Sequence, residues 1–380
     1  MSQSPAENDR RRQPKSKTGC RTCKKRKVKC DESRPACRKC VKHGVKCDFI
    51  ALSESDKLEL PSPLHQPYTY HHESGGFTIN DLELLHHYDT STCLTLTTEP
   101  LTRNFWRVNI PQIGFTTPYI LKGVLAVAAL HLARYRPERK DFYTTLAFHH
   151  HNAALAQASP LITKVDTDNC VNLFLFSTIT YYFAFGKPRS PTDFFLADND
   201  AVPDWLYLFR GVRALMESTG KLMRASSIAF IFEEGIKMHR AWEALEYENE
   251  GFQELQRNIQ ASVGTHEPAK LRVLLDAVET LRKSYAVVHD GSQSDENKSR
   301  GVFVWVYKIS DFYVDLVSAG DNEALCVLAY FCVLLRRLDF MWWIEGWGLH
   351  LIERIYARLN DKYRLWIRWP IEEIGWVPSY

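Results

Sequence analysis

The stretch CRTCKKRKVKCDESRPACRKCVKHGVKC, residues 20–47, holds six of the ten cysteines of this 380-residue chain. The six form two copies of the spacing C-x2-C-x6-C, copy one over residues 20–30 and copy two over residues 37–47. The cysteines are Cys20, Cys23 and Cys30 in copy one, and Cys37, Cys40 and Cys47 in copy two, at a constant offset of 17. An internal repeat of this kind can supply two equivalent halves of one symmetrical site.

Disulfides, a redox pair and a metal site are the three uses that this spacing allows. Disulfides need an oxidising compartment, and the N-terminal MSQSPAENDRRRQPKSK lacks the apolar core of a signal peptide. A thioredoxin-like site needs one C-x-x-C beside a βαβ pattern, whereas two pairs and two further cysteines are present here. Metal binding accounts for all six, because thiolates are soft ligands and a structural Zn²⁺ takes four of them in a tetrahedron.

The number of thiols predicts how many zinc ions the repeat holds. One zinc ion uses four cysteines and leaves two without a role. Two zinc ions need eight ligand positions, and six thiolates fill these only when two of them bridge both metals. Because the repeat makes equivalent residues the natural bridges, we predict that Cys20 and Cys37 bridge.

The six cysteines, together with Pro35 in the loop between the copies, resemble the fungal zinc binuclear cluster, the Zn2Cys6 domain of fungal transcription factors. The resemblance implies two Zn²⁺ per chain, with the first and fourth cysteines as bridges. It also implies binding to double-stranded DNA in the nucleus, through the short helix that follows the second cysteine.

The residues between the second and third cysteines differ in charge between the copies. Copy one reads KKRKVK over residues 24–29 and copy two reads VKHGVK over residues 41–46, so copy one is at least as basic at every position. A metal site does not require this difference, which indicates a polyanion on one side of the site; a solvated charge run is the alternative interpretation.

By position, the resemblance assigns a role to each basic residue of copy one. Arg26 and Lys27 would approach the base edges of a CGG-like or TCG-like triplet, because cationic side chains donate to the O6 and N7 acceptors of guanine. Lys24 and Lys29 would contact phosphates, which fixes register without reading sequence. Further basic residues precede the cluster and add phosphate contacts or a nuclear-import signal. These are Arg10, Arg11, Arg12, Lys15 and Lys17.

Charge and composition predict that the chain consists of a basic N-terminal region and a more acidic remainder. Residues 1–50 contain 16 Lys/Arg and 5 Asp/Glu, a net charge of +11, which leaves −8 for the remainder because the whole chain carries +3. We expect a basic disordered N-terminus over residues 1–17, a Zn2Cys6 DNA-binding domain over residues 18–49, a flexible proline-containing linker over residues 50–76, and an all-α domain over residues 77–380. Because residues 49–60 offer at most two heptads, any homodimer is expected to form through the all-α domain.

Helical spacing of apolar residues runs through residues 77–380. Asn80 is predicted to cap the first helix, and Thr117 with Pro118 to begin another. Further helical runs begin near Arg139, Asp168, Pro203, Pro268 and Asn322. The apolar run over residues 171–185 is shorter than the roughly 20 residues that a membrane span requires, so no span is expected.

Catalytic motifs are not found in the sequence: there is no P-loop, H-E-x-x-H or G-x-S-x-G, and we predict that the protein is not an enzyme. The three histidines at residues 149–151 point about 100° apart on a helix and are poorly placed to share one ion. The four cysteines outside the repeat have no ligand spacing and are predicted to be core residues. They are Cys93, Cys170, Cys326 and Cys332.

Three stretches of the predicted all-α domain resemble the fungal sterol uptake control family: residues 81–96, 205–216 and 322–355. The resemblance implies a regulatory domain that senses a sterol and dimerises. Trp343 and Trp347, beside Gly346 and Gly348, are predicted to line a concave site for a sterol-like or other lipophilic ligand. Simple core packing is the alternative for both tryptophans.

The sequence as a whole predicts a nuclear transcription factor that acts with the transcription machinery. Genes of sterol or lipid metabolism and genes of secondary metabolism are the alternative targets. The alternative is a lipid-binding protein or enzyme that carries an accessory zinc module.

Overall fold

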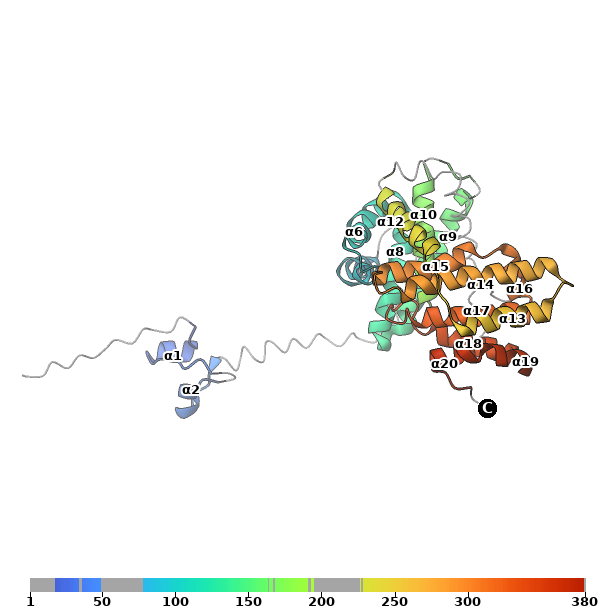
Figure 1. Cartoon of the computed structure of the whole chain (residues 1–380). Helices are drawn as coiled ribbons and strands as arrows, with labels where there is room; N and C mark the ends of the chain where they lie inside the picture. The colour runs from blue at the N-terminus through green and yellow to red at the C-terminus, as the bar shows by residue number, and fades with distance from the viewer. Residues whose placement is uncertain are drawn as a thin grey trace, which may run out of the picture. The chain divides into compact units, whose positions relative to one another are not determined.

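The computed structural model describes residues 18–33, 36–48, 78–162, 164–166, 168–190, 193–194, 226 and 228–378. The chain divides into two compact units, Met1–Gly75 and Gly76–Tyr380 (Figure 1). The predicted N-terminal arm, linker, Pro35 and the helix near Pro203 lie outside the described residues, as does the stretch 205–216. The boundaries of the four predicted segments therefore stay a prediction.

The first unit, which we call the cysteine module (residues 18–48), contains two short helices, α1 (Arg21–Lys25) and α2 (Arg38–Lys42). One helix comes from each copy of the repeat. The buried cluster of this unit consists of its six cysteines, with Ala36 packed against it. Val28 and Val45, which occupy equivalent positions, are equally exposed at 38%. The described residues of the module therefore have no apolar core of the ordinary kind.

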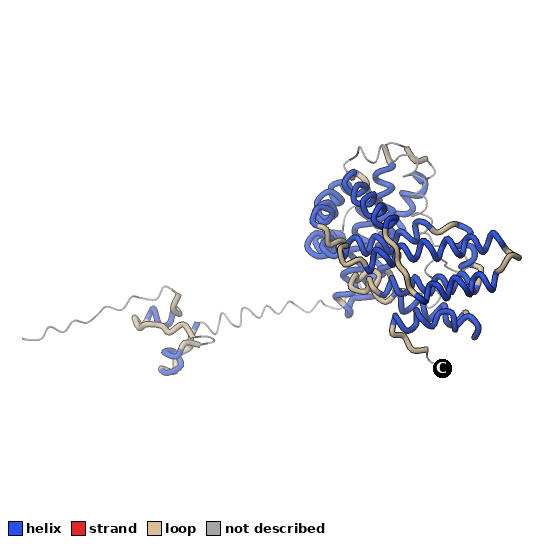
Figure 2. Tube along the Cα trace, viewed as in Figure 1, coloured by secondary structure: helices blue, strands red, loops and turns tan. Residues whose placement is uncertain are grey.

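The second unit, which we call the body (residues 78–378), is helical, and no strand is assigned among its described residues (Figure 2). The helices of its first half are α4 (Ile79–His87), α5 (Cys93–Thr95), α6 (Pro100–Asn104), α7 (Ile110–Thr116), α8 (Pro118–Tyr135), α9 (Lys140–Ile162) and α10 (Cys170–Gly186), with the π-helical turns η1 (Tyr88–Thr92) and η2 (Phe105–Asn109) and the 3-10 turn η3 (Pro137–Arg139). The helices of its second half are α12 (Ala229–Ala244), α13 (Glu250–Val263), α14 (Pro268–His289), α15 (Asp295–Lys308), α16 (Asp311–Ser318), α17 (Asn322–Arg336), α18 (Trp347–Arg358), α19 (Asp361–Arg364) and α20 (Arg368–Ile374), with the 3-10 turn η4 (Leu365–Ile367). The predicted all-α fold is confirmed.

One helix lies at the centre of each half of the body. In the first half, α8 contacts α4, α7, α9 and α10, and nearly all of its residues from Tyr119 to Ala133 are buried. In the second half, α17 contacts α13, α14, α16, α18, α19 and α20 (Figure 1), and every residue from Glu323 to Leu335 is buried. A helix that is apolar on all faces is stable only when other helices surround it.

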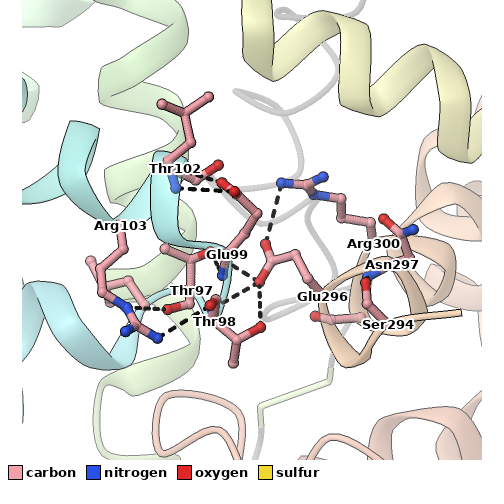
Figure 3. A network of polar contacts seen from close by, with 12 residues as sticks. Thr97, Thr98, Glu99, Thr102, Arg103, Ser294, Glu296, Asn297 and Arg300 are labelled. Atoms are coloured by element: carbon pink, nitrogen blue, oxygen red, sulfur yellow. Dashed lines mark hydrogen bonds and ion pairs between the residues drawn. The ribbon is translucent and has the colours of Figure 1, made fainter.

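A polar network joins the two halves. Glu296, at the start of α15, accepts hydrogen bonds from Thr97 Oγ1 at 3.0 Å and from Thr98 N at 3.1 Å (Figure 3). Arg300 lies 3.4 Å from the other oxygen of Glu296. Arg103 donates to the carbonyl oxygens of Thr97 and Thr98 and so fixes the turn that presents them. The network provides hydrogen-bond partners for polar groups where the two halves meet, and it links residues nearly 200 positions apart in the sequence.

Helix starts follow the sequence signals in most cases. Pro118 is the first residue of α8 and Thr117 is its N-cap, as predicted. The prediction that Asn80 caps the first helix is wrong. Thr78 is the N-cap of α4, and Thr78 and Asp81 bond each other's backbone N–H groups in a capping box. This reciprocal pair satisfies two backbone donors, which a single Asn side chain could not do.

No single helix among the described residues is both long enough and apolar enough to cross a membrane. Taken together, α16 and α17, whose axes bend by 103° between them, have the length and the apolar composition of a membrane-spanning segment.

Candidate metal centre and nucleic-acid interface

The six cysteines of the repeat lie together, and all are buried. Their Sγ atoms form two groups of four, and within each group all sulfur atoms lie within 4.8 Å of one another. One group contains Cys23 and Cys30, the other contains Cys40 and Cys47, and both contain Cys20 and Cys37. The two residues predicted as bridges are thus the two that the groups share.

The sulfur spacing fits zinc. A Zn–S bond of 2.3 Å in a tetrahedron places neighbouring sulfur atoms about 3.8 Å apart. The Sγ atoms of Cys20 and Cys37 are 3.7 Å apart, and those of Cys23 and Cys37 are 3.5 Å apart. The Sγ atoms of Cys20 and Cys40 are separated by 3.7 Å. Each set of four cysteines therefore has the number of sulfur atoms and the spacing that a tetrahedral zinc ion needs.

Backbone N–H groups point at the sulfur atoms in the same way in both copies. Cys20 and Cys37 are the N-caps of α1 and α2, and their Sγ atoms accept from the N–H three residues later, at 3.3 Å and 3.4 Å. The Sγ atoms of Cys30 and Cys47 accept from the N–H groups of Cys20 and Cys37, at 3.4 Å and 3.5 Å. Hydrogen bonds to a thiolate stabilise its charged form, so the backbone is arranged for metal-bound sulfur.

Burial raises the pKa of the Cys20 and Cys23 thiols. Burial also raises that of Cys37, but hydrogen bonds from the Cys40 N–H and from neighbouring thiols outweigh it and lower the pKa to about 6. A buried thiol releases its proton when a metal ion compensates the charge, so metal binding by these residues is coupled to proton release.

The predicted DNA-contacting residues lie on α1 and the turn that follows it. Lys24 is on the helix, Arg26 is its C-cap, and Lys27 and Lys29 follow; all four are exposed. Lys27 has a backbone φ of 54°, in the left-handed region that costs most residues about 1–2 kcal/mol. The equivalent residue of copy two is Gly44, with φ of 60°. Both copies make the same turn, and copy one makes it with a lysine.

Two aspartates that the sequence analysis did not single out complete the module. Asp48 accepts from the backbone N–H groups of Arg21 and Thr22, and Asp31 accepts from those of Arg38 and Lys39. The bond from Arg21 lowers the pKa of Asp48. A signal for them was present, because the two aspartates are related by the same offset of 17 as the cysteines.

Comparisons with known proteins match both units. The model of the fungal Zn(2)-Cys(6) binuclear cluster domain matches residues 18–56, and that of the fungal specific transcription factor domain matches residues 83–242. The chain belongs to the fungal Zn2Cys6 transcription factors. The predictions of a transcription factor rather than an enzyme, of DNA binding and of two zinc ions per chain are confirmed.

Relatives extend this similarity over most of the chain. A Zn(2)-C6 fungal-type transcription factor of Gibberella zeae is 25% identical over 95% of this chain and 86% of its own length. Sterol uptake control protein 2 of Candida albicans is 21% identical over 77% of this chain and 42% of its own length. The Zn(2)-C6 fungal-type transcription factor afumD of Aspergillus fumigatus is 29% identical over 55% of this chain and 56% of its own length.

In this Zn2Cys6 protein, the two tryptophans predicted to bind a ligand are buried between the halves of the body. Trp343 is 3% exposed, and its ring centroid lies 5.2 Å from those of Tyr181 and Tyr182. Trp347 is 4% exposed and donates from Nε1 to the carbonyl oxygen of Phe185 at 3.0 Å. The indole N–H of Trp343 is buried without an acceptor among the described residues. Both tryptophans pack as core residues, and their ligand role stays a prediction.

Gly346 and Gly348, which flank Trp347 in the predicted ligand site, both lie at the start of α18. Gly346, with φ of 76°, is the N-cap of α18, and Gly348 lies inside that helix. A Cβ on Gly348 would lie 2.6 Å from the carbonyl oxygen of Cys332 in α17. Gly348 therefore lets α18 approach α17 closely. A pocket of about 200 Å³ among the described residues is lined by Val288, His289, Asp295, Lys298, Arg337, Leu338 and Phe340.

The remaining candidate ligands of the body have structural roles. His150 Nε2 lies 2.9 Å from Asp81 Oδ1, and the ring of His151 stacks on Phe183 with centroids 3.7 Å apart. The four cysteines outside the repeat are buried, as predicted. Within the described residues, the clusters with metal-ligand geometry are the two sets of four cysteines in the cysteine module.

Proposed function

We propose that this protein is a nuclear, sequence-specific regulator that reads a CGG-like or TCG-like triplet in duplex DNA through α1 and the turn after it. The observation that carries the proposal is the difference between two copies of one fold. Both copies supply three thiols, a five-residue helix and a left-handed residue. Metal binding uses the copies equally, so the extra exposed cations of copy one serve another ligand, and their sign indicates a polyanion.

The roles of the cations follow from their chemistry and position. Arg26 and Lys27, at the end of α1, are assigned to base edges, where cationic donors bind guanine O6 and N7. Lys24 and Lys29 are assigned to phosphates. The left-handed backbone of Lys27 supports its role, because glycine makes the same turn in copy two without strain, and strained residues persist where function requires their side chain.

The six cysteines of the repeat are assigned as the zinc ligands, with Cys20 and Cys37 bridging. Cys20 and Cys37 belong to both sets of four cysteines, which supports their bridging role. Zinc supplies the folding free energy of the module, and thereby fixes α1 for the contacts above.

The body is assigned a regulatory role, through contacts with a second copy and with the transcription machinery. Similarity to a protein named for sterol uptake control over 77% of the chain supports genes of sterol or lipid metabolism as targets. Transcript levels in a deletion strain, measured with and without sterol depletion, test this assignment; an unchanged response of sterol genes would contradict it.

The DNA assignment is tested with the full chain. Its preferred sequence is selected from a random duplex library, and affinities for that duplex and for a scrambled duplex are measured over a range of salt concentrations. Lys27→Ala is expected to weaken binding to the selected duplex by about 1–3 kcal/mol and to relax selectivity within the triplet. Lys29→Ala is expected to weaken binding to both duplexes alike and to reduce the salt slope by about one unit.

Copy two provides the matched control. Lys46 is the equivalent of Lys29 in copy two, so Lys46→Ala removes the same charge from the half that is not assigned to base reading. Its effect on selectivity should be small. Equal losses on selected and scrambled DNA for Lys27→Ala would contradict the base-reading role. Failure of the unaltered chain to select any sequence would contradict the proposed function itself.

A further inference from the structure

Each half of the cysteine module caps the helix of the other half. Asp31 follows the last cysteine of copy one, and its carboxylate accepts from the N–H groups of Arg38 at 3.2 Å and Lys39 at 3.4 Å, the first two residues of α2. Asp48 follows the last cysteine of copy two, and accepts from Arg21 at 2.9 Å and Thr22 at 3.2 Å, the first two residues of α1. The exchange is reciprocal, as the repeat requires.

These carboxylates supply acceptors that the helices do not have otherwise. The first turn of a helix leaves its N–H groups without partners in the helix. The N-cap residues Cys20 and Cys37 each accept one N–H, from the third helical residue, and their sulfur atoms are also metal ligands by assignment. A helix of five residues is not stable by itself, so its direction depends on what holds its two ends.

The two caps differ in the side-chain contact between the copies. Thr22 of α1 donates its hydroxyl to Lys46 O at 3.1 Å and lies 3.4 Å from Asp48 Oδ1. Copy two has Lys39 at the equivalent position, which has no hydroxyl. The start of α1 is therefore tied to copy two by two backbone N–H groups and one side chain, whereas the start of α2 is tied to copy one by the N–H groups.

We propose that Asp48, contributed by copy two, is the positioning residue that aims α1 at the DNA, whereas Asp31 has an equivalent structural role without an equivalent effect on recognition. The proposal rests on the proposed function, in which α1 and its following turn read bases. The five residues of α1 span about 7.5 Å, so a rotation of about 10° at the cap moves the far end by about 1.3 Å. A displacement of that size disrupts a two-centre hydrogen bond to a base edge, but it leaves phosphate attraction nearly unchanged.

Asp48→Asn and Asp31→Asn are the matched pair that tests this. Each removes one negative charge and replaces one of the two accepting carboxylate oxygens with an amide NH2, which donates and cannot accept. The full chain carrying either change is measured for zinc content, and for affinity to the duplex selected by the unaltered chain and to a scrambled duplex. Asp48→Asn is expected to keep two zinc ions, to bind scrambled DNA as tightly or slightly more tightly, and to lose about 5- to 10-fold in the ratio of the two affinities.

Asp31→Asn is expected to keep that ratio within about twofold. Equal loss of the ratio in the two variants, or no loss in Asp48→Asn, would overturn the proposal while leaving DNA binding by the unaltered chain intact. If Asp48→Asn binds fewer than two zinc ions, Asp48→Glu decides, since it keeps the charge and shifts the cap by one methylene. A reduced ratio with two zinc ions bound would support positioning, and an unchanged ratio would refute it.

Discussion

In the cysteine module the buried side chains are six thiols with Ala36 beside them, whereas in the body they include residues as large as Trp305, Phe252 and Tyr313. The module folds around ligands for a metal, because so short a segment cannot bury enough apolar surface. The body folds around two central apolar helices. The same chain thus obtains one fold from coordination chemistry and another from packing, and each should respond to treatments that leave the other intact.

Zinc removal is expected to have the largest effect, and to affect the module alone. Structural zinc contributes about 10–16 kcal/mol to modules of this kind, so chelation should unfold residues 20–47 and abolish DNA binding. All ten tryptophans of the chain lie after residue 100, so tryptophan fluorescence reports on the body. Its melting temperature should not change, and metal analysis should give two zinc ions per chain. A content of one zinc ion per chain would contradict the two-zinc site. A body whose melting temperature falls on chelation would contradict the independence of the body from zinc.

Trp343→Ala is expected to act on the body alone, with a cost of about 3–5 kcal/mol. The change removes a buried ring that contacts Tyr181 and Tyr182 across the join between the halves, and it leaves a cavity. Phe340→Ala, at a ring that is 61% exposed, is the control. Urea unfolding followed by fluorescence measures both, and zinc content should stay at two. A cost for Trp343→Ala no larger than that for Phe340→Ala would show that this join does not stabilise the body.

Glu323→Gln is expected to lower the stability of the body by about 2–3 kcal/mol at neutral pH. Burial raises the pKa of Glu323, but hydrogen bonds from Tyr363, Ser262 and Lys270 outweigh it and lower the pKa to about 2. A carboxylate with a lowered pKa stabilises the fold above its unfolded pKa of about 4.5 and loses that contribution as the pH falls toward 2.

The difference between the unaltered chain and Glu323→Gln should therefore shrink between about pH 4.5 and pH 2, as urea unfolding at several pH values would measure. Glu372→Gln, at an exposed residue of α20, is the control. A difference that stays constant over this range would mean that the charge of Glu323 does not stabilise the body.

Lys27→Gly is expected to have the smallest effect on stability. It should raise the stability of the module and lower selective DNA binding. Glycine relieves the left-handed strain at residue 27, so the module should gain about 1 kcal/mol, while selective DNA binding falls. Gly44→Ala is the matched reverse change, because a Cβ at Gly44 would meet no atom within 4 Å and adds the strain alone. Chelator competition measures both. If Lys27→Gly weakens zinc retention, the lysine itself stabilises the turn.

The sequence alone predicted the module better than the body, and for a physical reason. Ligand spacing is local, so the offset of 17 was enough to expect the thiol cluster and its bridging pair. The same offset relates Asp31 to Asp48, but an aspartate gives no local sign of whether it caps the next copy. In the body, the all-apolar segment of α17 predicted a helix, whereas the role of Gly348 depends on the backbone of α17, a tertiary contact that no local pattern encodes. The choice of Thr78 over Asn80 as a cap likewise depended on a reciprocal bond to Asp81.

The central position of α17 has a consequence for the order in which the protein is made. The module is complete at residue 48, early in synthesis, and can fold as soon as it leaves the ribosome and meets zinc. The helices of the second half of the body emerge later, and the apolar faces that they turn towards α17 stay without that partner until residues 322–336 have been translated. Folding of the second half of the body therefore waits for one of its last long helices. A message cut short before Asn322 would accordingly yield a chain that occupies the DNA sites of the intact protein without a completely folded body to regulate them.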